Sequence, residues 1–92
     1  MNHVRLRCQL LERKALRYTP AGLPCQEATV SVASPDKPSF EVGVVGFDQV
    51  AQQLGRADIG AHLQIEGQLQ RAALRSSKLN ILVNRIELIE SR

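Results

Sequence analysis

Nine of the twelve lysine and arginine residues in this 92-residue sequence lie in two short segments. Residues 1–25 hold five of these cations and one acid, and residues 71–85 hold four cations and no acid, so each segment carries a charge of +4. Residues 26–70 hold two cations and six acids and carry −4. The nine clustered cations are Arg5, Arg7, Arg13, Lys14, Arg17, Arg71, Arg75, Lys78 and Arg85. This segregation predicts a surface that binds a polyanion, provided that the fold brings the two segments together. The alternative is scattered charge that only keeps the protein in solution.

A protein that binds single-stranded nucleic acid, one kind of polyanion, needs aromatic side chains as well as cations. The bases stack on flat side chains, while the phosphates contact the cations. The sequence offers only Tyr18, Phe40 and Phe47, and it has no tryptophan. Tyr18 lies beside the first cations and is the best exposed candidate. Phe40 fits a stacking platform and a core position equally well, and Phe47 is predicted to be a core residue. We therefore expect binding to depend mainly on charge and to weaken steeply with salt.

Residues for catalysis or metal binding are not arranged in a recognisable pattern. Neither His3 nor His62 has a nucleophile or an acid at a spacing that suggests a catalytic pair, and no glycine-rich phosphate loop is present. The spacing of Cys8 and Cys25 fits neither a zinc site nor a redox pair. If the first two strands pair, Cys8 falls opposite the neighbourhood of Ala33, so we expect two reduced, half-buried thiols. We predict no enzyme activity, no cofactor and no metal.

The length and composition bound the class of protein. Ninety-two residues suffice for one domain, which we expect to span residues 1–92. The sequence is 43% hydrophobic and 23% charged, as in ordinary folded domains. No apolar run approaches the roughly 20 residues of a membrane span, and the first residues do not open a signal peptide. We therefore expect a cytoplasmic protein without a membrane segment.

Apolar and polar residues alternate at every second position through most of the sequence, which is the pattern of half-buried strands. The alternation predicts strands over residues 4–10, 27–32, 40–45, 63–70 and 79–90. The phase of the last strand slips between Val83 and Ile86, as a β-bulge would cause. Residues 19–22 (TPAG) predict a turn, and residues 34–38 (SPDKP) predict a loop.

One short helix interrupts this pattern. Asp48 is a candidate N-cap and Gly55 a candidate end, with the apolar side chains of Val50, Ala51 and Leu54 on one side. A helix of about two turns is not stable alone and must pack on a core.

The order strand, strand, strand, helix, strand, strand predicts an all-β OB-fold, a five-stranded Greek-key barrel with a short helix between strands 3 and 4. An unrelated five-stranded barrel or sandwich is the alternative. OB-folds hold their ligands across a strand face, between the loop joining strands 1 and 2 and the loop joining strands 4 and 5. Here these loops are residues 14–24 and 70–78, where both basic segments concentrate. The predicted nucleic-acid contacts are Arg13, Lys14, Arg17, Tyr18, Lys37, Phe40, Arg71, Arg75 and Lys78.

Several segments resemble, in order and spacing, the family of bacterial single-stranded DNA-binding proteins. They are NHVRL (2–6), LRYTPAGLP (16–24), GFDQVA (46–51), GAHLQIEGQL (60–69), SKL (77–79) and IELIE (86–90). The last two, together with residues 16–24, are especially similar to the primosomal members of that family. The sequence also ends directly after the last expected strand, without the acidic-tipped Gly/Pro-rich tail of the general members. This too favours the primosomal members.

The resemblance implies a homodimer of OB-folds that binds single-stranded DNA and helps to reload the replicative helicase at stalled forks. Its implied partners are the PriA helicase, the loader protein DnaT and single-stranded DNA-binding protein. By position, Lys78 matches a DNA-contacting lysine, and Phe40 falls near a stacking tryptophan of the relatives. Two alternatives stay open. One is a degenerate OB-fold that acts as a protein–protein interaction module with weak nucleic-acid affinity, its acidic middle segment contacting basic partners. The other is a general RNA-binding OB protein, since stacking and phosphate contacts do not distinguish the sugars.

Overall fold

The computed structural model describes residues 1–89. Its elements, in chain order, are β1 (Val4–Arg13), β2 (Arg17–Tyr18), β3 (Pro24–Ser34), β4 (Lys37–Phe47), α1 (Gln49–Arg56), β5 (His62–Arg71) and β6 (Leu79–Ile89). The predicted order of strands and helix is confirmed, with two-residue β2 as an addition inside the expected first loop. The predicted last strand extended to Glu90, which lies outside the described residues.

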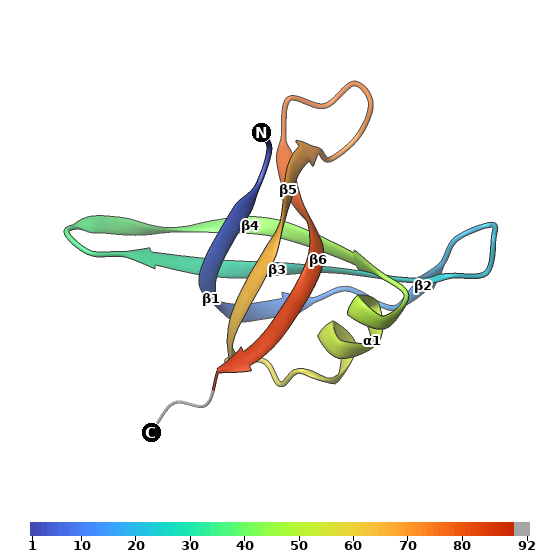
Figure 1. Cartoon of the computed structure of the whole chain (residues 1–92), viewed down its shortest axis with the longest axis horizontal. Helices are drawn as coiled ribbons and strands as arrows, with labels where there is room; N and C mark the ends of the chain where they lie inside the picture. The colour runs from blue at the N-terminus through green and yellow to red at the C-terminus, as the bar shows by residue number, and fades with distance from the viewer. Residues whose placement is uncertain (90–92) are drawn as a thin grey trace.

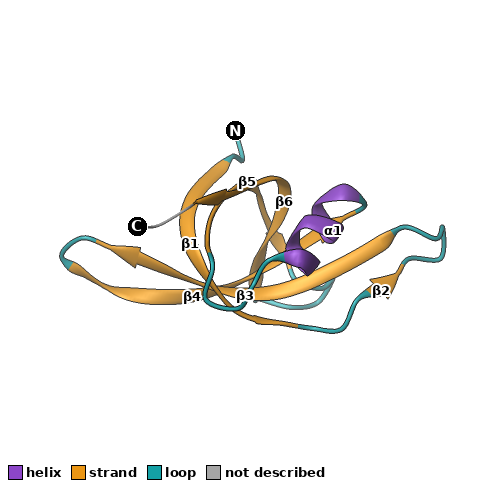
Figure 2. Ribbon diagram, turned by 90° about the horizontal axis from the view of Figure 1, so that it is seen from below, coloured by secondary structure: helices purple, strands orange, loops and turns teal. Residues whose placement is uncertain are grey.

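The strands close into a barrel (Figures 1 and 2). Hydrogen bonds join them in the order β1-β5-β6-β4-β3-β2, and an additional pairing of β1 with β3 closes the ring of five long strands. β4 and β6 are parallel, and the other pairs are antiparallel. With α1 between β4 and β5, this is the predicted five-stranded OB-fold.

Bulges in two strands allow the ring to close. β1 pairs with β5 up to Gln9 and with β3 from there on, and the register shifts between Leu10 and Glu12. Because a bulge bends its strand, β1 can leave one neighbour and reach the other. In β6 the register shifts between Val83 and Arg85, which confirms the predicted bulge.

The core lies inside the barrel, where inward-facing residues of all five long strands meet. Its fully buried side chains include Leu10, Val30, Leu63 and Ile65, and α1 adds Leu54. Ala51 is also buried and Val50 packs against the core, so the predicted apolar side of the helix is confirmed. Each large apolar side chain buried in this way contributes about 1.5–3 kcal/mol. Packing therefore holds an eight-residue helix that would not form alone.

Both predicted ends of the helix need correction. Asp48 occupies the N-cap position with a φ of 57°, but its side chain makes no capping hydrogen bond. The helix also continues through Gly55 to Arg56. It needs no glycine at its end because Ala57 leaves the helix in an extended conformation, with a φ of −71°. The Arg13 guanidinium donates to the carbonyl of Leu54 (3.3 Å) and to that of Ala57. A cation there also complements the helix dipole.

The expected loop at residues 34–38 is a tight turn. Ser34 pairs with Lys37 across the turn, and Asp36 takes a positive φ of 62°, a conformation that short polar side chains tolerate. Pro38 falls where the register shifts, so it interrupts no ladder hydrogen bond. β3 and β4 therefore form a long hairpin arm that extends beyond the barrel (Figure 2).

The two cysteines are free and buried, rather than half-buried as the sequence suggested. Burial raises the pKa of the Cys8 thiol to about 11. Within residues 1–89, no helix is long and apolar enough to cross a membrane.

Candidate nucleic-acid interface

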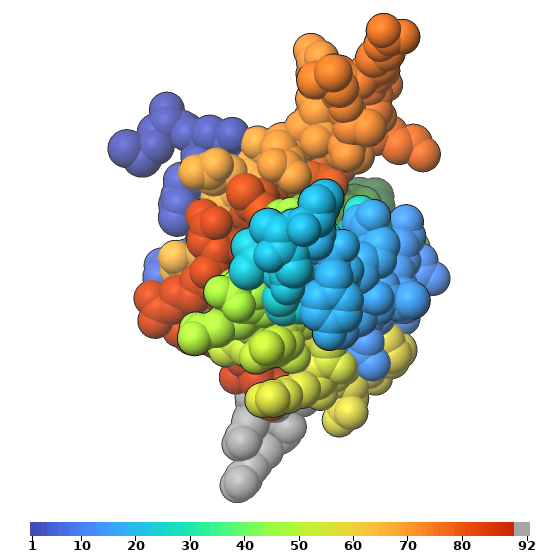
Figure 3. All heavy atoms as spheres, turned by 90° about the vertical axis from the view of Figure 1, so that its right-hand side faces the viewer, coloured from blue at the N-terminus to red at the C-terminus, as the bar shows by residue number. Residues whose placement is uncertain are grey.

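A groove runs across the outer face of β3 and β4, between the β1–β3 connection and the β5–β6 loop. It consists of two hollows of about 330 and 210 Å3 that share Glu27, Ala72 and Asn80 as lining residues. The first side, the β1–β3 connection, contributes Arg17 and Tyr18 to the larger hollow and Lys14 to the smaller one. The second side, the β5–β6 loop, contributes Lys78 to the smaller hollow. Figure 3 shows the two sides, with the segment around residues 17–24 in light blue and cyan and the β5–β6 loop in orange above it.

The floor of the groove is made by cross-strand pairs of β3 and β4. Glu27 lies opposite Val45, and on either side Cys25 pairs with Phe47 and Thr29 with Gly43. Side chains of a strand alternate between its faces, so these residues share the face opposite the barrel core. The floor is therefore mixed, with an acid and a hydroxyl among apolar groups.

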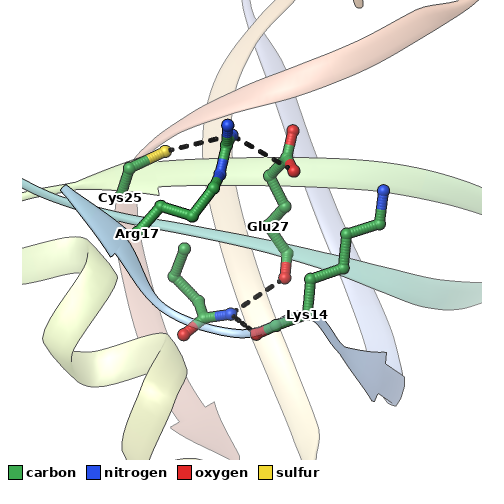
Figure 4. Close-up of polar contacts among 5 residues, drawn as sticks. Lys14, Arg17, Cys25 and Glu27 are labelled. Atoms are coloured by element: carbon green, nitrogen blue, oxygen red, sulfur yellow. Dashed lines mark hydrogen bonds and ion pairs between the residues drawn. The ribbon is translucent and has the colours of Figure 1, made fainter. Parts of the chain in front are cut away.

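Hydrogen bonds hold the first side of the groove against β3. The main-chain amide of Lys14 donates to the main-chain carbonyl of Glu27 (3.0 Å). The buried side-chain amide of Gln26 donates to the main-chain carbonyls of Lys14 and Glu27. Further along, β2 pairs with the start of β3, and the Gly22 amide donates to the carbonyl of Thr19 (2.8 Å), which confirms the predicted turn. Lys14 and Arg17 are thereby fixed on the two sides of Glu27 (Figure 4).

The β5–β6 loop forms the second side and is held by its own hydrogen bonds. The Ala72 amide donates to the carbonyl of Lys78 (2.9 Å), which closes the loop at its base. The Arg71 guanidinium donates to the carbonyl of Leu74 (3.3 Å), and the Lys78 amide donates to the Ser76 hydroxyl (3.0 Å). The cations of this loop are exposed beside the groove, where a polyanion can reach them.

The predicted contact residues fall into three places. Lys14, Arg17, Tyr18 and Lys78 line the groove. Arg71, the last residue of β5, and Arg75, in the β5–β6 loop, lie beside it. Tyr18 is 67% exposed, as expected of a stacking platform. Arg13 instead binds the end of α1, and Lys37 and Phe40 lie on the exposed hairpin arm outside the groove lining.

Three groove residues were missed by the sequence prediction. Phe47 was predicted to be a core residue, but it is 39% exposed and lines the larger hollow. The sequence indicates that Glu27 and Thr29 lie on the outward face of β3. Only the pairing of β3 with β4 shows that Phe47 lies on the same face. Asn80 of β6 lines both hollows, and its side-chain oxygen is buried without a hydrogen-bond partner among the described residues. Glu27 was missed because only the tertiary structure brings it between cations.

Ion pairs engage two cations of the barrel exterior and one cation of the groove. Arg5 pairs with Glu66 (2.9 Å) and Arg85 pairs with Glu87 (3.0 Å). None of these four residues lines the groove, so the two arginines belong to the outer faces of their strands. Inside the groove, Arg17 pairs with Glu27 (3.2 Å). Lys14, Arg71, Arg75 and Lys78 make no ion pair within residues 1–89. Over the same residues, no three His, Cys, Asp or Glu side chains gather into a group that could hold a metal ion.

Comparisons with known proteins agree with this architecture. A family model described as "Another single-strand binding protein family" matches residues 2–85. The replication restart protein PriB of Bordetella pertussis is 30% identical, with 88% of this chain and 82% of the relative covered. The solved structure of PriB from Ralstonia solanacearum has a TM-score of 0.85 at 26% identity and covers 97% of this chain and 99% of that one. The SSB domain of a Synechococcus protein has a TM-score of 0.77 at 27% identity, with 94% and 93% covered.

Proposed function

The chain belongs to the single-strand binding protein family, and on this premise we propose that it binds single-stranded DNA in the groove and serves replication restart. One observation carries the proposal. Two basic segments that lie some fifty residues apart in the sequence meet on opposite sides of one groove. A groove with cations on both sides and an open floor suits a flexible strand, whose phosphates must be contacted along its path.

In this proposal the strand lies along the groove as on other OB-folds. Lys14 and Lys78 contact phosphates from opposite sides, and Arg71 and Arg75 add charge from the loop. Tyr18 and Phe47 offer exposed rings to the bases, and each stacked base contributes about 1–3 kcal/mol. The hairpin arm, with Lys37 and Phe40, provides a further contact surface for a longer strand. The protein acts by binding and not by catalysis.

The name of the Bordetella relatives, replication restart protein, supports a role in reloading the replication machinery. We propose that the protein acts as a cytoplasmic homodimer in the restart primosome. There it holds single-stranded DNA while another surface recruits or stimulates the PriA helicase, together with DnaT and single-stranded DNA-binding protein. Light scattering tests the dimer, because a particle of the 10.2 kDa chain mass would contradict it.

Fluorescence anisotropy of a labelled oligo-dT of about 15–20 nucleotides tests DNA binding. Four groove-side cations without an ion pair predict a slope of log K against log salt of about −3, at roughly −0.7 per phosphate contact. Affinity should then fall about 50-fold between about 50 and 200 mM salt.

Charge-removing variants localise this binding. The double variant Arg75→Ala, Lys78→Ala should weaken binding and reduce the slope by about 1.4. The double variant Arg7→Ala, Arg56→Ala is the matched control, because it removes two exposed cations that do not line the groove. Equal effects of the two double variants would contradict the groove assignment. Absence of wild-type binding at low salt would contradict the proposed function and favour a protein–protein interaction module.

A further inference from the structure

A carboxylate occupies the middle of the groove, where a polyanion would be repelled. Glu27 lines both hollows, and its side chain is 33% exposed. Its carboxylate lies 3.2 Å from the Arg17 guanidinium, whose side chain is 62% exposed. In Figure 4 the side chains of Arg17 and Lys14 flank that of Glu27. One of the cations that faces the groove is therefore neutralised by a residue of the protein itself.

The fold does not require this carboxylate. The main-chain carbonyl of Glu27 accepts the structural hydrogen bonds from Lys14 and Gln26, and both would persist with a neutral side chain. A carboxylate this exposed forms only a weak ion pair, because water screens it. A DNA phosphate offers Arg17 a charge-assisted contact, as Glu27 does, and its oxygens suit the two-pronged guanidinium, so it can take the place of Glu27.

We propose that Glu27 is an affinity-setting residue of the groove, which occupies Arg17 while no strand is bound and gives it up to a phosphate on binding. This inference rests on the proposed single-stranded DNA binding. Glu27 keeps the affinity below what the groove cations alone would give, so that a bound strand can be released or passed on. Arg17 therefore contributes little to the net DNA affinity of the wild-type protein, because the ion pair that it forms with phosphate replaces its ion pair with Glu27.

The test measures oligo-dT anisotropy for Glu27→Gln, which preserves shape and removes the charge. We expect about threefold to tenfold tighter binding at low salt, as one unit charge near a phosphate would produce. The salt slope should become steeper by about 0.7, because one more cation becomes available to phosphate. Arg17→Ala should change binding little in the wild-type background. In the Glu27→Gln background it should reduce the increase in affinity, because only the relief of repulsion between Glu27 and phosphate then remains.

Glu87→Gln is the matched control. Glu87 is also ion-paired on a strand, with Arg85 at 3.0 Å, but it lies seven residues along β6 from Asn80, about 20 Å away. We expect its substitution to leave oligo-dT binding unchanged, and thermal unfolding should show that both variants are folded. Equal binding by Glu27→Gln and Glu87→Gln would overturn this inference and leave the proposed function standing. A wild-type protein that does not bind at low salt would remove both.

Discussion

Gln26 connects the stability of the barrel to the position of a groove cation, and replacing it tests that connection. Its side chain is 2% exposed and donates to the carbonyls of Lys14 and Glu27. It thereby fastens the segment after β1 to β3, beside the groove. The substitution Gln26→Met keeps the size and flexibility of the side chain and removes both hydrogen bonds.

The expected loss follows from these two contacts. A hydrogen bond contributes about 0.5–1.5 kcal/mol net, so the variant should be destabilised by about 1–3 kcal/mol. For a domain of this size, this corresponds to a melting temperature lower by about 5–20 °C. The Lys14 carbonyl belongs to an exposed residue and can turn to water, which favours the lower part of the range. Lys14 keeps the hydrogen bond from its main-chain amide to Glu27 but loses the one from Gln26, so it is held less firmly and the salt slope of DNA binding should become shallower by up to about 0.7.

Urea titration followed by circular dichroism measures the stability, and oligo-dT anisotropy measures the binding. Gln68→Met is the matched control, because Gln68 is an exposed glutamine on β5. We expect this control to unfold at the wild-type midpoint. If Gln26→Met unfolds at the same midpoint as Gln68→Met, the two hydrogen bonds contribute nothing and the reasoning is refuted.

Four further predictions concern single residues. Gly67→Ala should cost at least about 1–3 kcal/mol in urea unfolding, because an added methyl would overlap the main chain of β6; wild-type stability would contradict this. Tyr18→Ala should weaken oligo-dT binding by about 1–3 kcal/mol at unchanged stability, and Phe40→Ala on the arm should cost less; the reverse order would place the strand on the arm. Burial raises the pKa of Cys8 to about 11, so in a Cys25→Ser background a thiol reagent at about pH 8 should label the folded protein far more slowly than the unfolded one. This pKa lies above that of the thiol in the unfolded protein, so the free energy of unfolding should fall as the pH rises above about 9. A free energy of unfolding that stays constant above this pH would contradict the prediction.

Local chemistry explains why several predictions from the sequence are confirmed. Alternation of apolar and polar residues depends on the two-residue repeat of a strand, so it reports each strand and its buried face directly. The turn at residues 19–22 follows from Pro and Gly at the required positions, and the bulge between Val83 and Ile86 follows from a break in alternation. The order of these elements then predicts the barrel.

Residues whose roles depend on distant partners were beyond this reasoning. Arg13 was predicted to contact nucleic acid, but α1, some forty residues later, offers it carbonyl groups. Phe47 was predicted to enter the core, but its pairing with Cys25 puts it on the outer face.

The sequence alone determined the strands, the helix and the two basic segments, because these depend on residues close together in the chain. The order of these elements also predicted that the two segments flank one groove, and the tertiary structure brings them there by pairing β1 with both β3 and β5. Only the tertiary structure decided that Glu27 faces Arg17 there. Strand register sets which side chains meet across a sheet, and register is a property of pairs of strands that neither strand carries by itself.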